Sequence, residues 1–108
     1  MELIVKRKGF SMDYGIKSRV LEEICDFARL YDIEKVYLFG SRARGDFKER
    51  SDIDLATVGG NHFKFAIDVE EETSTLLKFD VVNLDASISD GLRESIEKEG
   101  KIIYEKVR

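Results

Sequence analysis

Segments with helical spacing alternate along this chain with short segments typical of strands, and this alternation constrains the fold more than any other feature. Helical spacing of apolar residues predicts helices over residues 16–31 and 63–77, and a last helix that begins at Ser89 and ends at Gly100. Short apolar runs predict strands at residues 36–39, 51–58 and 79–84. This order predicts an α+β or α/β domain in which helices pack on a single sheet.

Polar residues and glycines mark where further elements begin and end. Ser41 is expected to cap a short helical turn over residues 42–44, which Gly45 ends, and Asn61 is expected to cap the helix that follows. Residues 102–104 are apolar and predict an additional strand at an edge of the sheet. The order and directions of the strands stay open, because the apolar pattern does not specify them.

The length of 108 residues predicts one domain. We interpret residues 1–15 as an N-terminal tail or short strand and residues 16–108 as the folded domain. The basic cluster Lys6, Arg7 and Lys8 is interpreted as a solvated terminus, with contact to a partner as the alternative.

Charge and cysteine content disfavour several classes of protein. The net charge of −4 disfavours a nucleic acid as the main partner, because proteins that bind nucleic acids ordinarily carry a basic excess. Cys25 is the only cysteine, so no intramolecular disulfide can form, which fits a cytoplasmic protein. We interpret it as a small buried residue. No apolar run is long enough to cross a bilayer, so we expect no membrane partner.

A glycine–serine pair follows the first predicted strand and begins a predicted helical turn. Gly40 allows a ligand to approach the backbone closely, Ser41 adds a hydroxyl donor, and the start of a helix favours phosphate. Arg42 and Arg44 supply positive charge that suits phosphate oxygens, although two side chains so spaced on a turn cannot both point inward. By itself this pattern is also explained by an ordinary helix cap.

Acidic residues lie within two of the predicted strands. Asp52 and Asp54 are two residues apart, so their side chains point the same way and can share hard cations such as Mg²⁺. Asp80 interrupts the apolar run of the next strand, where a charged group either faces solvent or meets a cation. Taken singly, each feature is also explained by exposed acids on a solvated face.

Taken together, these features resemble the nucleotidyltransferase superfamily that includes DNA polymerase beta. Ten residues separate the Gly40-Ser41 pair from Asp52. More narrowly, Gly-Ser-Arg-Ala-Arg-Gly-Asp at 40–46 and Ser-Asp-Ile-Asp-Leu at 51–55 look like the motifs of minimal nucleotidyltransferases, the MNT proteins paired with HEPN-domain toxins. The resemblance extends from about Ile16 to Tyr104. It implies the nucleotidyltransferase fold, with a single mixed sheet on which helices pack.

The resemblance also implies a role for each motif residue. Gly40 and Ser41 match residues that hold the triphosphate of the nucleotide, with Arg42 and Arg44 as further candidates for nucleotide binding. Asp52 and Asp54 match the metal-binding carboxylates. Asp80 matches the third acid, which helps to bind the metal and accepts the proton of the attacking hydroxyl.

The function that the resemblance implies is a magnesium-dependent transfer of AMP from ATP. Two Mg²⁺ ions are expected, and the acceptor is a hydroxyl, of a tyrosine, on a HEPN toxin partner that the chain would neutralise as an antitoxin. Two alternatives stay open: a non-catalytic module that neutralises a toxin by occlusion, and a transferase that acts on a small molecule. Because one small domain encloses a nucleotide poorly, we expect a homodimer or a complex with the toxin.

Overall fold

The computed structural model describes residues 2–4 and 14–107, and within these residues all strands form one five-stranded sheet in the order β1-β5-β2-β3-β4. The strands are β1 (Glu2–Ile4), β2 (Lys35–Phe39), β3 (Ile53–Val58), β4 (Phe79–Asn83) and β5 (Lys101–Lys106). Strands β3 and β4 run parallel, and the other neighbours run antiparallel. The sheet is therefore mixed, as the resemblance implied.

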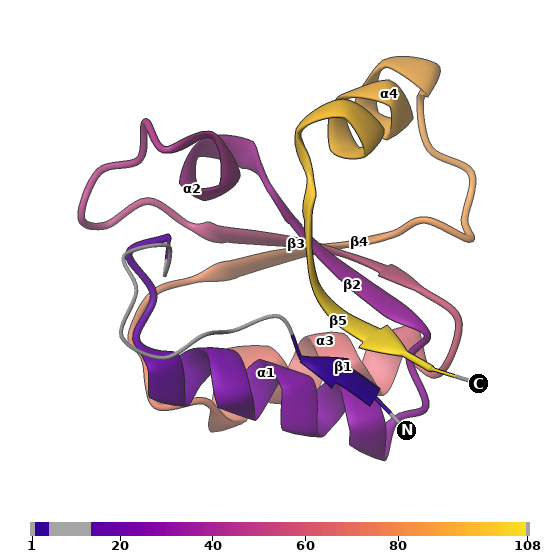
Figure 1. Ribbon diagram of the computed structural model, residues 1–108, viewed down its shortest axis with the longest axis horizontal. Coiled ribbons are helices and arrows are strands. Elements are labelled where there is room, and N and C mark those ends of the chain that lie inside the picture. Colours follow the sequence, from indigo (N-terminus) through magenta and orange to yellow (C-terminus); the bar gives the residue numbers. More distant parts are fainter. Residues whose placement is uncertain (1, 5–13, 108) are drawn as a thin grey trace.

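Helices cover both faces of this sheet. They are α1 (Ser18–Leu30), α2 (Gly40–Arg44), α3 (His62–Glu72) and α4 (Asp90–Glu99). In Figure 1, α1 and α3 lie together below the sheet, while α2 and α4 lie above it. No helix in the described part of the chain has both the length and the apolar character needed to cross a membrane.

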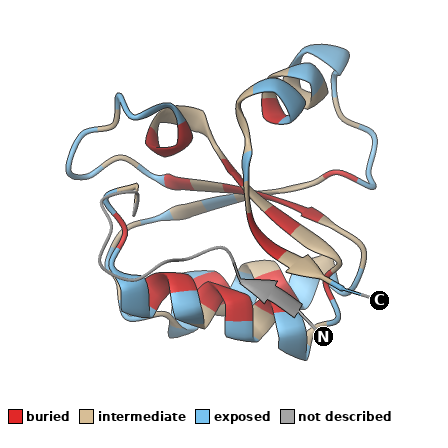
Figure 2. Ribbon diagram, in the orientation of Figure 1, coloured by how far each residue is buried: buried red, intermediate tan, exposed pale blue. Residues whose placement is uncertain are grey.

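The larger core lies between the sheet and helices α1 and α3. Apolar side chains of α1 and α3 pack against alternate residues of the strands, and Figure 2 shows buried positions along the inner sides of both helices. Its fully buried members include Ile24, Val36, Leu38, Leu55 and Phe65. Burial of this apolar surface is the main force that holds the two helices on the sheet.

The opposite face of the sheet has a smaller core, which lies under α4. Ala56, Leu84 and Ile96 are buried there, with half-buried residues such as Tyr37 and Val82 around them. This cluster covers only part of the face. The part toward the end of β2 carries polar and charged residues instead, and these include the predicted site.

Most elements lie where the spacing predicted them. The helix predicted over residues 16–31 forms as α1, and the strands predicted at 36–39, 51–58 and 79–84 form as β2, β3 and β4. Cys25 is buried, as expected. Asn61 caps α3 by accepting a hydrogen bond from the Lys64 N–H, and Ser89 caps α4 in the same way through the Leu92 N–H.

Three predictions about boundaries and edges are wrong. Ser41 does not cap α2, because that helix begins one residue earlier, with Phe39 as its N-cap residue. Helix α3 ends at Glu72 and not at residue 77, and Leu76 beyond it is fully exposed although its spacing suggested a buried face. The strand at 102–104 is interior, because β1 pairs with the outer side of β5.

The structure describes only part of the segment 1–15. Strand β1 lies within the segment 1–15, for which a tail and a short strand were both open. Lys6, Arg7 and Lys8 lie outside the described residues. The division of the chain at residue 15 stays a prediction.

Candidate active site

The three predicted aspartates lie at one end of the sheet. Asp54 is the second residue of β3, and it lies opposite Asp80 in the parallel pairing with β4. Partners on neighbouring strands are roughly 4.8 Å apart across the sheet. Asp52 precedes β3 and lies two residues from Asp54. The sheet therefore brings together acids that lie 26 and 28 residues apart in the sequence.

Asp54 and Asp80 share the sheet face that carries α2 and α4. Ile53 and Leu55 are buried in the core on the α1 and α3 side, so Asp54 between them points to the opposite face. Val81 packs against the same large core, so its neighbour Asp80 also points away from it. Asp54 and Asp80 therefore point to the same face of the sheet.

The carboxylates of Asp52 and Asp80 repel that of Asp54. Burial raises the pKa of the Asp54 carboxyl above its ordinary value, and the charges of Asp80 and Asp52 raise it further. Arg44 and Arg42 offset only part of this effect. Repulsion of this kind is relieved by a cation, and carboxylate oxygens are the ligands that Mg²⁺ prefers.

The side chains are not already gathered into a metal cage. Among the described residues, no group of three His, Cys, Asp or Glu side chains is close enough to hold an ion in this conformation. Asp52 and Asp80 are exposed, so both side chains have room to rotate. The carboxylates therefore fit a hard cation in residue type, and whether they hold one stays a prediction.

Gly40 lies directly against Asp54. Its φ of +75° is in the left-handed region, which disfavours any side chain. A Cβ at this position would also collide with the Asp54 carboxylate. The backbone at the start of α2 therefore approaches the acidic group as closely as it does only because residue 40 is glycine.

Ser41 follows within the first turn of α2 and is half-buried. Its carbonyl accepts hydrogen bonds from the N–H groups of Gly45 and Asp46, which closes the short helix. The glycine–serine bend thus lies at the same end of the sheet as Asp52, Asp54 and Asp80.

Arg42 was expected to bind the nucleotide, but its side chain is buried. It is only 1% exposed, and its guanidinium donates to the backbone carbonyls of residues 14, 15, 48, 49 and 51. An arginine has five N–H donors, and these contacts occupy all of them. Burial lowers the pKa of Arg42, and the charges of Asp52 and Asp54 act in the opposite direction. In this conformation the side chain has no donor left to offer a phosphate.

Arg44, the other arginine expected to bind the nucleotide, is exposed. It forms ion pairs with Asp46 at 3.2 Å and with Glu99 of α4 at 3.3 Å. The hydrogen bond to Asp46 is the main reason that the pKa of Arg44 is raised. Its positive charge also acts on Asp54. Arg44 could contact a nucleotide after exchanging these surface carboxylates for phosphate oxygens.

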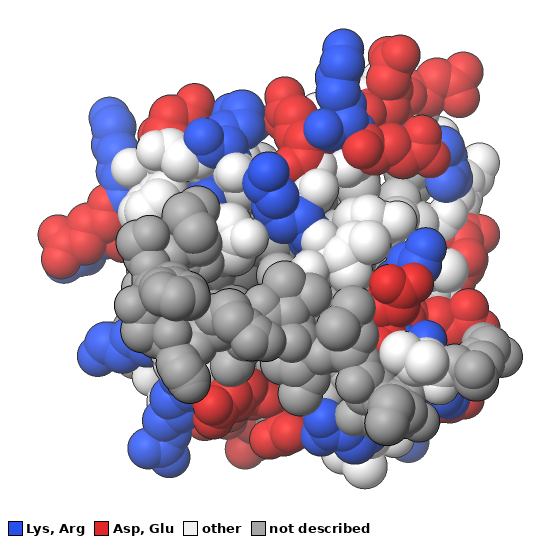
Figure 3. Space-filling model, in the orientation of Figure 1, with Lys and Arg blue, Asp and Glu red and all other residues white. Residues whose placement is uncertain are grey.

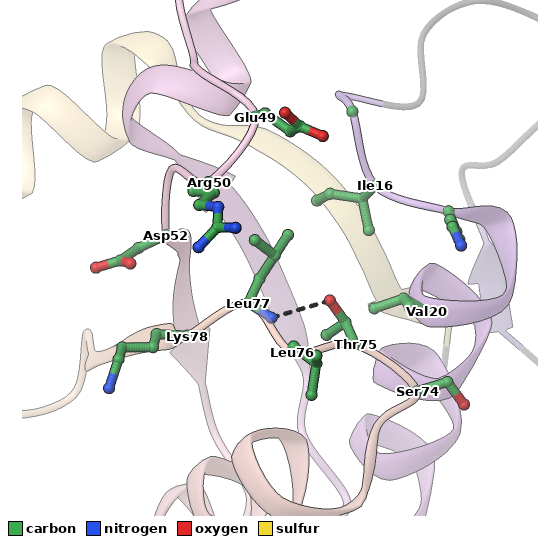
Figure 4. A pocket seen from close by; sticks show the side chains of 12 residues that line it. Ile16, Val20, Glu49, Arg50, Asp52, Ser74, Thr75, Leu76, Leu77 and Lys78 are labelled. Carbon is green, nitrogen blue, oxygen red and sulfur yellow. Dashed lines mark hydrogen bonds between the residues drawn. The ribbon is translucent and has the colours of Figure 1, made fainter.

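A pocket of about 640 Å³ adjoins Asp52, and no pattern in the sequence indicated it. Ile16, Val20 and Leu77 provide apolar walls, and Arg50 points into the pocket in Figure 4, above Leu77. Its residues come from three separate segments, at 15–20, 49–52 and 74–78. Only the fold brings these segments together, so no local motif could have revealed the pocket.

Basic and acidic side chains are interspersed on the face of the molecule shown in Figure 3. Over α2 and α4 the two signs alternate, and no broad basic patch is visible among the residues that the structure describes there.

Comparison with known proteins identifies a matching family and a similar protein. Residues 22–108 match the family model described as polymerase beta, nucleotidyltransferase. A protein of Methanocaldococcus jannaschii, provisionally named a protein adenylyltransferase, is 37% identical over 81 residues. That match covers 67% of this chain and 79% of the relative.

Solved structures share the fold. A chain in the crystal structure of a toxin–antitoxin with AMP-PNP aligns with a TM-score of 0.66 and 23% identity, over 80% of this chain and 73% of its own length. A chain in a mutant of the toxin–antitoxin MntA-HpeT aligns with a TM-score of 0.63 and 20% identity, over 80% of this chain and 73% of its own. At these identities the likeness is one of fold.

Proposed function

This chain belongs to the polymerase beta nucleotidyltransferase family, and from that premise we propose that it transfers AMP from ATP to a protein hydroxyl. The observation that carries the proposal is the contact between Gly40 and Asp54, with Asp80 opposite Asp54 on the next strand. A glycine bend against a group of carboxylates can hold a triphosphate beside divalent cations. Those are the two requirements of nucleotidyl transfer.

Each residue of the candidate site would have its own role in this transfer. Asp52, Asp54 and Asp80 would hold magnesium, two ions in our proposal, which when bound neutralises charge on the reacting phosphate. Gly40 and Ser41 would orient the triphosphate. The acceptor oxygen forms a bond to the α-phosphorus while the bond to pyrophosphate breaks. Asp80 takes the proton of the acceptor hydroxyl, so the products are the adenylylated acceptor and pyrophosphate.

We propose that the acceptor is a tyrosine of a HEPN-domain toxin and that the chain acts as a cytoplasmic antitoxin. The name of the relative from M. jannaschii supports a protein acceptor, and the AMP-PNP in one solved toxin–antitoxin supports an adenine nucleotide. The open site supports a large acceptor, because Asp52 and Asp80 are exposed at the end of the sheet.

The test combines the purified chain, Mg²⁺, ATP labelled on the α-phosphate, and a candidate HEPN protein from the same genome. We expect label on the HEPN protein, and mass spectrometry should place one or more AMP groups on a tyrosine. A folded chain that transfers no label in the presence of Mg²⁺ would contradict the proposal. Label confined to serine or threonine would contradict only the choice of tyrosine.

A second candidate function is neutralisation by occlusion. Phe63 and Ile67 lie one turn apart on α3 and are 72% and 54% exposed, which provides apolar surface for a partner. The double variant Asp52→Asn with Asp54→Asn separates the two functions, because it removes metal ligands and leaves α3 intact. If this variant still neutralises the toxin fully, catalysis is dispensable.

A further inference from the structure

Arg42 connects three segments of the chain that meet beside the acidic group. Its Nε and Nη2 atoms both donate to the Ser51 carbonyl, at 3.1 and 2.8 Å. Nη2 also donates to the carbonyls of Glu49 at 3.1 Å and Lys48 at 3.5 Å. The loop between α2 and β3 is therefore folded around this one guanidinium.

The contact with Ser51 bears directly on Asp52. The Ser51 carbonyl belongs to the peptide group that joins Ser51 to Asp52. The two hydrogen bonds from Arg42 therefore hold the backbone directly before Asp52. On the other side, the Ile53 N–H donates to the Lys78 carbonyl at 2.9 Å and begins the pairing with β4. The backbone of Asp52 is thus fixed on both sides, although its side chain is exposed.

The remaining donors of Arg42 hold the segment before α1. Nη1 donates to the carbonyls of Tyr14 and Gly15, each at 3.1 Å. Both of these residues have φ in the left-handed region, at +60° and +71°. The Phe47 ring lies 4.8 Å from the guanidinium carbon and covers it by a cation–π contact. Arg42 therefore stabilises an unusual turn as well as the loop before β3.

A lysine could not reproduce this arrangement. The ammonium group carries its donors on one atom, whereas these carbonyls are spread around a planar fork. Arg42 also lies close enough to Asp52 and Asp54 for its charge to act on both. Arg42 therefore acts on the acids through the position of the backbone and through its charge. Neither effect requires a bound ligand to touch Arg42.

We propose that Arg42 is a positioning residue, which fixes the backbone of Asp52 so that its carboxylate can join Asp54 and Asp80 around the divalent cation of the nucleotide. The inference rests on the proposed function. It replaces direct nucleotide binding by Arg42 with an action through Asp52. Loss of a residue that orients a metal ligand typically lowers metal affinity by about 10- to 100-fold.

The experiment compares the wild-type chain with Arg42→Lys, and with Arg93→Lys as the matched control. Arg93 on α4 also donates to a backbone carbonyl, that of Leu84 at 3.0 Å, but at the other end of β4 from Asp80. Two quantities are measured: the affinity for Mn²⁺ with AMP-PNP, by calorimetry, and the rate of amide hydrogen exchange in the peptide that covers residues 46–53.

For Arg42→Lys we expect affinity for Mn²⁺ with AMP-PNP to fall about 10-fold and exchange in residues 46–53 to accelerate. Arg93→Lys should change neither quantity. If Arg42 only stabilised the fold, the lysine variant would melt at a lower temperature but would bind Mn²⁺ normally below that temperature. A folded Arg42→Lys chain with unchanged affinity would therefore overturn the inference.

A milder variant covers the case in which Arg42→Lys does not fold. Ser51→Ala removes the hydrogen bond from the Lys48 N–H to the Ser51 hydroxyl, at 2.8 Å, and loosens the same loop without removing the buried charge. We expect a smaller loss of affinity with faster exchange. Faster exchange with full affinity would overturn the inference. A wild-type chain that binds no Mn²⁺ with AMP-PNP would instead overturn the proposed function, and this inference with it.

Discussion

At the scale of single residues, the site depends on side chains whose position leaves little choice of residue type. Gly40 adopts a left-handed φ and lies against the Asp54 carboxylate, so both conformation and space exclude a larger residue. Arg42 satisfies backbone carbonyls of two loops, which no other side chain could do with one planar group.

We predict that Gly40→Ala impairs both stability and nucleotide binding. The left-handed conformation costs an alanine about 1–2 kcal/mol, and the added Cβ displaces the Asp54 carboxylate. Thermal unfolding and calorimetry with AMP-PNP and Mg²⁺ would measure the two effects.

Gly91→Ala is the control for that variant. Gly91 lies in α4, and a Cβ there would meet nothing within 4 Å. It should raise stability by about 0.5 kcal/mol and leave binding unchanged. Equal behaviour of the two variants would contradict the role given to Gly40.

His62 is predicted to make the chain less stable as the pH falls from 7.5 to 5.5. Its ring accepts or donates a hydrogen bond with the Thr57 hydroxyl at 2.9 Å, and burial lowers its pKa below 6.5. The unfolded chain therefore binds a proton more readily than the folded chain, so stability is lost as pH falls through the unfolded pKa toward the folded one.

Urea unfolding of wild type and His62→Gln at several pH values tests this. His62 is the only histidine, so little else in the side chains titrates between pH 7.5 and 5.5. The loss of stability should be smaller in the glutamine variant. An identical pH dependence in both chains would exclude His62 as its source.

At the scale of elements, the candidate site lies where β3, β4 and α2 begin. Strands β3 and β4 run parallel and bring Asp54 opposite Asp80, while α2 begins immediately after β2 and places Gly40 against Asp54. Helix α4 contributes at a distance, because Glu99 near its end pairs with Arg44 of α2. The stability of α4 therefore matters to the surface beside the site.

We predict that Ser89→Ala destabilises the chain by about 1 kcal/mol, because the Ser89 hydroxyl caps α4 by accepting the Leu92 N–H at 3.1 Å. Ser87→Ala is the matched control, since Ser87 is exposed and lies before the helix. Denaturant unfolding of both variants measures the difference. Equal midpoints would show that the cap contributes nothing.

At the scale of the whole molecule, the two faces of the sheet are unequal. The face under α1 and α3 has a continuous core, whereas the face under α4 has a small one and leaves the acidic end open. A domain of this kind would enclose a nucleotide on one side only. The expected homodimer or toxin complex, which would cover the open side, stays a prediction.

For the occlusion candidate, we predict that Phe63→Ser with Ile67→Ser weakens association with the toxin by about tenfold or more, because an apolar pair on α3 would lose its contact with the partner. Light scattering and titration with the HEPN protein measure it. Nucleotide binding should not change, because α3 lies on the other face of the sheet. A chain that stays monomeric and binds no partner, with or without the substitutions, would contradict the expected assembly.

The sequence by itself determined the elements and the motif. Local spacing predicts α1, β2, β3, β4 and α4, because the apolar period of each segment reflects the face that it buries. It also identifies Asp52 and Asp54 as a pair two residues apart, although Asp52 precedes β3 in the structure, and it places the glycine–serine bend after β2. All of these follow from residues within a few positions of one another.

Only the tertiary structure decided how these parts meet. The interior place of β5, the direction of Arg42 and the pocket beside Asp52 depend on contacts between distant segments. Arg42 had the residue type expected of a phosphate ligand, yet backbone carbonyls occupy its donors, those of residues 14, 15, 48, 49 and 51. Sequence spacing predicts the faces of helices and strands because those are local, whereas the partner of a long side chain is set by whatever the fold brings within its reach.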